Sequence, residues 1–441
     1  MKKKISLILI CALLVLSFAA CTSAPPEATP APPAPAPEAT PAPADNGDDD
    51  DDGDFAGREL VVGIWGGNDT EMGAMEEMQA NFEAMTGASV TFRVYTDYNT
   101  QIQADFIAGT APDVFYVNAD VFEFFDSLGV LAPLDRQAVD ADAFYTSLID
   151  TFVGTSGQLY AVSKDFSTLA LYVNLDMLED AGLTVTDIPT AWEDFIDFLP
   201  EFQALLDVEY GAGAVTAMSY NLELPRNLHL LNRGGASVTT ADGRANLNSP
   251  GVIENFQLIM DLIATGAYQR PQDLGLGWNG EAFGAGRVAI MDEGNWVYNF
   301  LKTEFSDVNF AVLNMPSFRG EVSSMMFTVG YGIFIDSENQ DLALEWIRYA
   351  TGVDGMAIFT GATGVLPSRQ DVADKINVAA DPFLQIHLDQ VQHAIPWSIG
   401  LYGSIINGEY MNFLLEAVQG NMTVEDAMRM AEEQANFQIG E

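Results

Sequence analysis

Polar and aromatic side chains stand directly after two short apolar runs, where they could bind a ligand. Trp65 and Asn68 follow the first run of the globular part, with two glycines between them, and Asn118 and Asp120 follow a later run. Planar amides and carboxylates form hydrogen bonds, an aromatic ring offers a flat apolar face, and glycine lets a ligand approach the backbone. This combination suits noncovalent binding of a small molecule with hydroxyl groups and flat C–H faces.

The patterns on which catalysis, metal binding or nucleotide binding usually depend are missing. The three histidines, His229, His387 and His393, form no His-Glu-x-x-His motif and no close cluster. There is no Gly-x-Ser-x-Gly elbow, and the Gly-x-Gly-x-x-Gly string at 275–280 follows no β-rich run. Paired carboxylates could serve a glycoside hydrolase, but among 63 acidic residues such pairs arise by chance. We therefore predict no enzyme activity, no cofactor and no metal site.

The elements that must position these side chains alternate between strands and helices. Apolar or alternating runs predict strands at 60–65, 90–94 and 112–117. Helical stripes between them predict one helix that ends at Gly87 and another near 101–108. This order predicts an α/β fold with a parallel sheet, which places ligands at the carboxyl ends of its strands. The methionines of the first helix, Met72, Met75, Met78 and Met85, are expected to pack in the core.

Helices dominate the rest of the chain, and their first residues carry capping signals. The segments 190–193 and 423–426 each have the pattern of a capping box. Ser249 before Pro250 marks another helix start. Further strands are expected near 169–173, 308–313 and 332–335.

The N-terminal residues have the pattern of an export signal. Three lysines precede an uncharged apolar run at 5–20, and such a segment is typical of a secretory signal peptide. Residues 16–21 resemble the bacterial lipobox, although Phe18 stands where that motif usually has leucine. The resemblance implies that Cys21 is lipidated and becomes the N-terminus. An uncleaved anchor or plain secretion is the alternative.

Residues 21–57 are expected to form a tether rather than a fold. A Pro/Ala-rich stretch favours extended conformations, and the aspartates that follow repel one another. Calcium binding by these aspartates is an alternative, but their spacing does not match an EF-hand loop. The second cysteine, Cys11, lies within the predicted signal peptide, so the processed chain would contain no disulfide.

The composition of the remaining part describes a large acidic globular protein. About 385 residues follow the tether, enough for two domains or for one two-lobed domain. The net charge of the whole chain is -45, and beyond the first residues the only lysines are Lys164, Lys302 and Lys375. Nucleic-acid binding is not expected, because phosphate neutralisation requires basic patches.

Short motifs run in a fixed order through the globular part, among them Ala-Gly-Thr-Ala-Pro-Asp-Val-Phe at 108–115. They lie at 60–65, 82–87, 108–115, 131–135, 160–165, 172–174, 181–183, 189–192, 282–291 and 364–369. The sequence shows no short-period repeat. Together with Trp296 they resemble family 1 extracellular solute-binding proteins, the sugar-binding lipoproteins of ABC importers, to which maltose-binding protein is distantly related. Each motif is weak alone, but their order from about residue 59 to 437 is specific.

The resemblance implies two α/β lobes joined by hinge crossings, with a ligand cleft between them. The solute-binding domain would span 58–441, after a signal peptide at 1–20. Lobe one would hold about 58–164 and a return at about 308–352. Lobe two would hold about 168–305 and 356–441. Hinge closure around the ligand is the expected mechanism.

The resemblance also adds candidate ligand residues. Asp120 falls where the maltose-binding relative has a ligand carboxylate, and Trp296 matches its sugar-stacking tryptophan. Lys164 and Asp165 stand at the first hinge crossing. Tyr331 is expected to begin a strand of lobe one. The complete candidate set is Trp65, Asn68, Asn118, Asp120, Lys164, Asp165, Trp296 and Tyr331, with Trp278 and Arg369 as weaker choices.

Several of these residues have a structural alternative. Trp65 could belong to the core, Asp120 could cap a helix, and Lys164 could be a surface charge. Asp113, which is not a candidate, is expected to be a structural turn residue.

The implied function is that of a monomeric, lipid-anchored receptor on the extracytoplasmic face of the cell membrane. It would bind a mono- or oligosaccharide or a related polyol and deliver it to ABC permease subunits. An extracellular glycan-acting enzyme and a ligand sensor for a signalling partner remain alternatives. The sequence does not name the solute.

Overall fold

The computed structural model describes residues 55–67, 69–233, 235–322 and 324–440. The predicted signal peptide, Cys21 and nearly all of the predicted tether lie outside the described residues, as does Asn68. Among the helices that are described, none is both long and apolar enough to cross a membrane.

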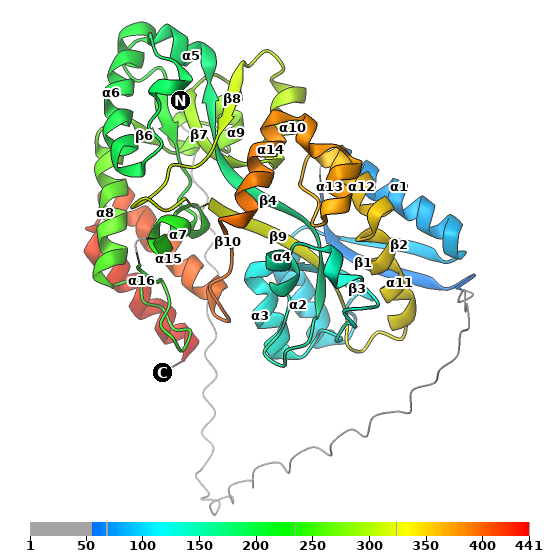
Figure 1. The fold of residues 1–441 in the computed structure, drawn as a ribbon. Coiled ribbons are helices and arrows are strands. Elements are labelled where there is room, and N and C mark those ends of the chain that lie inside the picture. The colour runs from blue at the N-terminus through cyan, green and yellow to red at the C-terminus, as the bar shows by residue number, and fades with distance from the viewer. Residues whose placement is uncertain (1–54, 68, 234, 323, 441) are drawn as a thin grey trace, which may run out of the picture. The chain divides into compact units, whose positions relative to one another are not determined.

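The first elements build a parallel sheet with helices on its faces, as predicted (Figure 1). Apolar runs form β1 and β3, and glycines at positive φ, such as Gly87 and Gly109, end the helices. These elements are β1 (Glu59–Trp65), α1 (Asp69–Thr86), β2 (Ser89–Tyr95), α2 (Tyr98–Ala108), β3 (Val114–Asn118), α3 (Ala119–Leu128) and the short α4 (Thr146–Asp150).

Two long strands, β4 (Ala161–Asn174) and β9 (Ser324–Ile333), run from this sheet into a second group of strands. The first half of β4 pairs antiparallel with β9, and its second half pairs with β7 and β8. All residues of β4 are buried. The strand order β2-β1-β3-β9-β4-β7-β5-β6 therefore joins two parallel sheets through two antiparallel crossing strands.

The second group of strands is covered mainly by helices from the middle and the end of the chain (Figure 1). Its strands are β5 (Thr216–Ser219), β6 (Tyr268–Gln269), β7 (Val288–Gly294) and β8 (Phe310–Leu313). Its helices are α5 (Leu175–Asp180), α6 (Trp192–Tyr210), α7 (Leu224–Arg233), α8 (Pro250–Ala264), α9 (Asn279–Gly284), α10 (Trp296–Glu304), α15 (Gly403–Val418) and α16 (Val424–Ile439).

The remaining elements follow β9. They are α11 (Gln340–Ala350), α12 (Val353–Thr363), α13 (Gln370–Lys375), α14 (Pro382–Asp389) and β10 (Ala394–Pro396), which pairs with β9.

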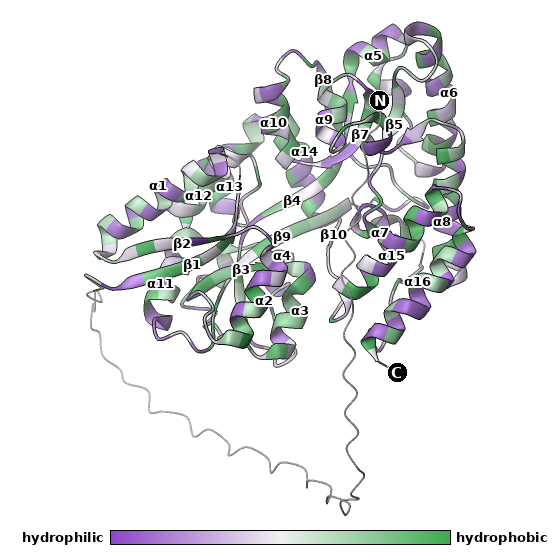
Figure 2. Cartoon of the chain, turned by 180° about the vertical axis from the view of Figure 1, so that it is seen from behind, coloured by the Kyte–Doolittle hydropathy of each residue, from purple (hydrophilic) through white to green (hydrophobic). Residues whose placement is uncertain are grey.

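Two large hydrophobic cores define the two lobes. Lobe one surrounds Phe82, Phe115 and Trp346, and lobe two surrounds Phe195 and Phe256. Peripheral helices such as α1 and α16 alternate between hydrophilic and hydrophobic residues along their length (Figure 2), as expected for helices with one buried face. The two cores agree with the predicted two-lobed fold class.

The lobe limits expected from the sequence need two corrections. Residues 310–313 were expected in lobe one, but β8 pairs with the far half of β4 and its Val312 packs beside Tyr172 in lobe two. Residues 356–363 were expected in lobe two, but Met356 and Phe359 of α12 pack in the core of lobe one. Both segments lie next to a point where the chain passes between the lobes. Their position in the sequence therefore does not show which hydrophobic core they pack in.

Three local predictions also differ from the structure. Tyr331 was expected at the start of a strand, but it lies near the end of β9, opposite Tyr116. The capping box predicted at 190–193 is absent, because the Glu193 carboxylate accepts a hydrogen bond from the Arg319 N–H at 2.9 Å instead. Met85 of the predicted core stripe is exposed. Asp113 has the structural role expected of it, since its carboxylate accepts hydrogen bonds from the Val61 N–H and the Ser337 hydroxyl.

Candidate functional site

A cavity of about 170 Å³ lies where the two lobes and both crossing strands meet. Lobe one contributes the end of β1, the first turns of α1, and part of α12. Lobe two contributes the start of α10. The lining residues are Ile64, Trp65, Gly67, Glu71, Met72, Met75, Tyr116, Lys164, Asp165, Ser167, Trp296, Phe327, Val329, Phe359 and Val365.

Lys164 reaches this cavity because it is the extra residue of a β-bulge. In the pairing of β4 with β9, Ser163 faces Gly330 and Asp165 faces Val329, which leaves Lys164 without a place in the ladder. A bulge of this kind re-aims one side chain. The register shift therefore turns a strand residue toward the ligand space.

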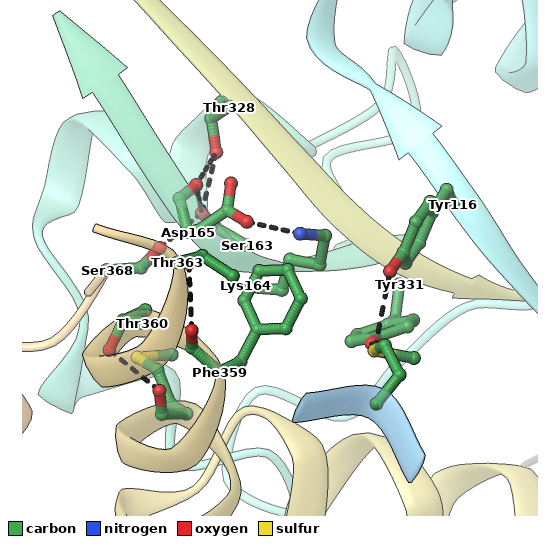
Figure 3. A network of polar contacts seen from close by, with 12 residues as sticks. Tyr116, Ser163, Lys164, Asp165, Thr328, Tyr331, Phe359, Thr360, Thr363 and Ser368 are labelled. Carbon is green, nitrogen blue, oxygen red and sulfur yellow. Dashed lines mark hydrogen bonds and ion pairs between the residues drawn. The ribbon is translucent and has the colours of Figure 1, made fainter. Parts of the chain in front are cut away.

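The Lys164 side chain is buried between an anion and two aromatic rings. Its ammonium group forms an ion pair with the Asp165 carboxylate and lies 4.0 Å from the ring centre of Phe359 and 4.9 Å from that of Tyr116. Figure 3 shows Lys164 extended past the Phe359 ring, with Asp165 at its head group. A buried charge is tolerated only with such partners, so the sequence alternative of a surface charge for Lys164 is wrong.

Hydroxyl groups from three segments stabilise the bulge. The Ser163 hydroxyl lies 2.7 Å from the Thr328 hydroxyl and 2.6 Å from the Ser368 hydroxyl (Figure 3). The Thr328 hydroxyl donates to the backbone carbonyl of Asp165 at 2.8 Å. Because both crossing strands take part, the polar centre of the cavity sits on the connection between the lobes.

Trp65 forms the lobe-one wall of the cavity at the end of β1. Its ring lies 5.3 Å from Tyr98 in an edge-to-face arrangement and 4.5 Å from Tyr116. The Tyr98 hydroxyl donates to the Tyr116 carbonyl at 2.6 Å. Rings therefore hold the Trp65 indole, and the residue both touches the core and lines the cavity.

Trp296 forms the opposite wall at the first position of α10. Its indole N–H donates to the Glu293 carboxylate at 2.9 Å, and its ring meets Phe327 edge-to-face at 5.4 Å. The two tryptophans thus reach one cavity from different lobes.

A second compartment of about 420 Å³ adjoins the first along α10. The two share Glu71, Trp296 and Val365 as lining residues. The second compartment also offers the Asn299 amide, the Thr303 hydroxyl and the Phe300 ring. Trp296 therefore stands between two spaces of the same cleft.

The other candidates among the described residues do not line this cavity. Asn118 precedes α3 without a side-chain capping bond, and burial raises the pKa of Asp120 to about 6 beside its hydrogen-bond partner Trp397. Tyr331 is buried, with its hydroxyl 3.8 Å from the Met75 sulfur. Arg369 is engaged by the Asp140 and Asp371 carboxylates. Of the seven main candidates that the structure describes, Trp65, Lys164, Asp165 and Trp296 come together at the cavity.

Several lining residues were missed from the sequence. Met72 and Met75 were predicted to pack in the core. Met75 is indeed buried, but both side chains also line the cavity. Their spacing of three residues shows a shared helix face but not what that face meets. No predicted strand or motif in the sequence singles out Phe327 or Phe359. Only the tertiary fold brings them to the cleft.

The chain belongs to the bacterial extracellular solute-binding proteins, whose family model matches residues 77–385. A putative binding protein of Brucella abortus (strain 2308) is 25% identical over 315 residues, which cover 68% of this chain and 73% of that protein. The galactooligosaccharide-binding protein of Bacillus subtilis (strain 168) is 23% identical over 364 residues, covering 78% of this chain and 76% of the relative.

Solved structures share the fold. The GacH receptor of Streptomyces glaucescens GLA.O, known unliganded and with acarbose, aligns with a TM-score of 0.73 and 21% identity over 85% of this chain and 97% of the receptor. An ABC substrate-binding protein of Listeria monocytogenes in complex with cycloalternan aligns with a TM-score of 0.74 and 19% identity, covering 87% and 99% of the two chains. These likenesses confirm the predicted two-lobed solute-binding fold.

Proposed function

We propose that this extracellular solute-binding protein takes up a carbohydrate between its lobes, closes over it, and delivers it to an ABC-type permease without chemical change. The observation that carries the proposal is the pairing of Trp65 and Trp296, one from each lobe, across a cavity whose centre holds Lys164 and Asp165. Aromatic faces suit the C–H faces of a sugar ring, and the charged pair suits its hydroxyl groups. The named ligands of similar proteins, acarbose, cycloalternan and galactooligosaccharides, support this class.

The lining favours a neutral carbohydrate over an anionic one. Among the described residues that line the two compartments, Lys164 is the only basic one, and it is already paired with Asp165. Asp69, Glu71 and Glu304 line the second compartment. A uronate or sugar phosphate would therefore meet carboxylates. The second compartment also leaves room for more than one sugar ring.

The crossing strands supply the movement. Lobe one and lobe two have separate cores, and the β4 and β9 strands connect them. A ligand that contacts Trp65 and Trp296 at once makes more contacts when the lobes approach, so binding shifts the population toward the closed state. In the bulge, Lys164 and Asp165 can contact the ligand at the same place where the lobes turn.

The proposed site of action is the outer face of the cell membrane. Membership of an extracellular family supports an extracytoplasmic location. We further propose that Cys21 carries the lipid and that residues 22–57 tether the receptor near its permease as a monomer. Palmitate labelling of the full chain and of a Cys21→Ala variant in a bacterial host would test the anchor, which fails as a proposal if both chains are labelled equally.

A thermal-shift screen tests the ligand class most directly. We would screen galactotriose, maltotriose, acarbose, cycloalternan, D-tagatose and D-glucuronate, because a ligand at about 100 times its Kd adds about 2.7 kcal/mol of stability. We expect a neutral saccharide to raise the midpoint and small-angle scattering to show compaction. Phe437→Ala is the control for Trp296→Ala, since the exposed Phe437 ring lines neither compartment.

Two outcomes would overturn the proposal. Cleavage of a saccharide by the purified protein at a useful rate would favour an extracellular glycan-acting enzyme. Binding of no carbohydrate in a broader panel would reject the ligand class. Loss of uptake in cells that lack the chain would separate transport from sensing.

A further inference from the structure

Trp296 is held by a buried ion pair that does not itself line the cavity. The Glu293 carboxylate accepts the hydrogen bond from the Trp296 indole N–H at 2.9 Å. The same carboxylate lies 3.3 Å from the guanidinium nitrogens of Arg226 on α7. The central carbon of that guanidinium lies 5.6 Å from the centre of the Trp296 ring. Arg226 therefore contacts both the indole and the anion that orients it.

The backbone at Gly294 completes this arrangement. A β-carbon at Gly294 would lie 2.1 Å from the Trp296 ring. The indole thus packs directly on the last residue of β7, in space that any other residue would fill. With Phe327 at its edge, the ring has a defined orientation before a ligand arrives.

The buried ion pair is not explained by a contribution to the stability of the core. Arg226 and Glu293 are 9% and 1% exposed, and a buried ion pair often contributes less stability than apolar residues of the same volume. Its benefit is therefore better sought in the geometry that it imposes. Here the imposed geometry is that of the lobe-two wall of the cleft.

We propose that Arg226 and Glu293 are positioning residues that fix the Trp296 indole in its ligand-binding orientation. The inference rests on the proposed function for its effect on carbohydrate affinity. The orientation itself is a property of the protein without ligand. An indole that is already oriented loses less freedom on binding, and such preorganisation raises affinity.

The test replaces the ion pair by neutral residues of similar size. Arg226→Met with Glu293→Leu removes both charges of the ion pair together. The measurements are made at about pH 5, where the neighbouring buried Asp292, whose pKa is raised to about 7 by burial, holds its proton, so no buried charge is left unpaired. Arg226→Met with Glu293→Gln is the matched rescue variant, because the glutamine carbonyl can still accept the indole N–H. Each pair is made with and without Trp296→Phe, which isolates the spectroscopic signal of Trp296 from those of the other tryptophans.

The first measurement needs no ligand. We expect the Trp296 contribution to near-ultraviolet circular dichroism to fall by at least half in the Met/Leu variant and to return in part in the Met/Gln variant. A purely structural role would lower the thermal midpoint of both variants and leave this contribution unchanged. That result would overturn the proposal, even if the carbohydrate assignment held.

The second measurement uses the saccharide with the largest shift among those screened above. We expect about a tenfold loss of affinity in the Met/Leu variant, a smaller loss in the Met/Gln variant, and no further loss when Trp296→Phe is already present. Additive losses in the Trp296→Phe background would contradict the proposal, because positioning acts only through Trp296. If no saccharide binds, the proposed function fails while the spectroscopic result still decides the role of the ion pair.

Discussion

The two walls of the cleft hold their tryptophans by different means. In lobe one, Trp65 lies against Tyr98 and Tyr116, so aromatic contacts orient it. In lobe two, the Trp296 indole is bonded to the Glu293 carboxylate, which Arg226 balances. Ring packing is adaptable, whereas a charged hydrogen bond has a strict geometry. The comparison suggests one wall that adjusts to the ligand and one that is set in advance.

The largest expected difference between the walls is in stability. Glu293→Leu alone removes the buried partner of Arg226 and leaves the half-exposed Glu223 carboxylate, 3.5 Å away, as its remaining ion-pair partner. Breaking a buried ion pair typically costs about 3–5 kcal/mol. Tyr98→Phe in lobe one removes a single hydrogen bond to the Tyr116 carbonyl, worth about 1 kcal/mol. Chemical denaturation of both variants measures the difference. Equal losses would show that the two walls are held alike.

The second expected difference between the walls is in how much each tryptophan contributes to ligand affinity. We expect Trp296→Ala to lower affinity for the best saccharide by about 2–3 kcal/mol and Trp65→Ala by about 1–2 kcal/mol, since truncation of buried aromatic anchors costs about this much. The smaller second value follows from Tyr98 and Tyr116, which remain as rings beside the vacated space. Calorimetry with the exposed Phe437→Ala as control measures both losses. A larger loss at Trp65 would reverse the comparison.

The pH dependence of stability should also differ in sign between the lobes. In lobe two, burial raises the pKa of Asp292 to about 7, partly opposed by Arg226, while neighbouring Glu293 and Glu223 raise it further. The folded state then holds a proton that the unfolded state has lost, so this group destabilises the fold as pH rises from about 4 to about 7. We expect Asp292→Asn to be more stable than the unmodified protein at pH 8, by up to about 4 kcal/mol, and equal to it below pH 4.

In lobe one, Asp341 should show the opposite trend. The Arg58 guanidinium lowers the pKa of Asp341 to about 2. Its contribution is therefore present above the ordinary value of an aspartate and is lost as pH falls toward 2. Asp341→Asn should be slightly less stable than the unmodified protein at pH 7 and equal to it at pH 2. Thermal melts from pH 2 to pH 8 test both assignments. If the melting temperatures of Asp292→Asn and Asp341→Asn, relative to the unmodified protein, changed with pH in the same direction, both pKa assignments would be contradicted.

The smallest predicted effect concerns the second compartment beside Trp296. Asn299→Ala should weaken binding of a trisaccharide by about 0.5–1.5 kcal/mol, the net value of one hydrogen bond, and leave a monosaccharide unaffected. Asn299 lines only the second compartment, whereas Lys164 lines only the first. Calorimetry with D-tagatose and galactotriose measures the difference. Equal weakening for both sugars would mean that the second compartment does not bind a second ring.

The sequence was most informative where local patterns carry structure. The apolar run at 60–65, the alternation at 90–94 and the glycine after each early helix predicted β1, β2, α1 and α2 well. The crossing strands were seen only in part, because polar residues such as Ser163, Lys164 and Thr168 interrupt the pattern of β4. They are buried through pairing with β9, a partner more than 150 residues away, which no local signal reveals.

The candidate site residues were likewise predicted only in part. Trp65 stands directly after a predicted strand, and Lys164, Asp165 and Trp296 were found through motif resemblance; all four line the cavity. Asn118, Asp120 and Tyr331 satisfied the same reasoning, yet they do not line it. Strand ends identify a region of the fold, whereas the direction of each side chain depends on packing against distant elements.

By itself the sequence determined the class of the protein, because the order of motifs and the alternation of strands and helices are local properties that survive in the linear chain. The tertiary structure decided which residues share the cleft. Lys164 enters it through a register shift between two strands, and Trp296 receives its orientation from Arg226, on a helix 70 positions earlier in the chain. Both depend on contacts between segments that meet only when the lobes have folded.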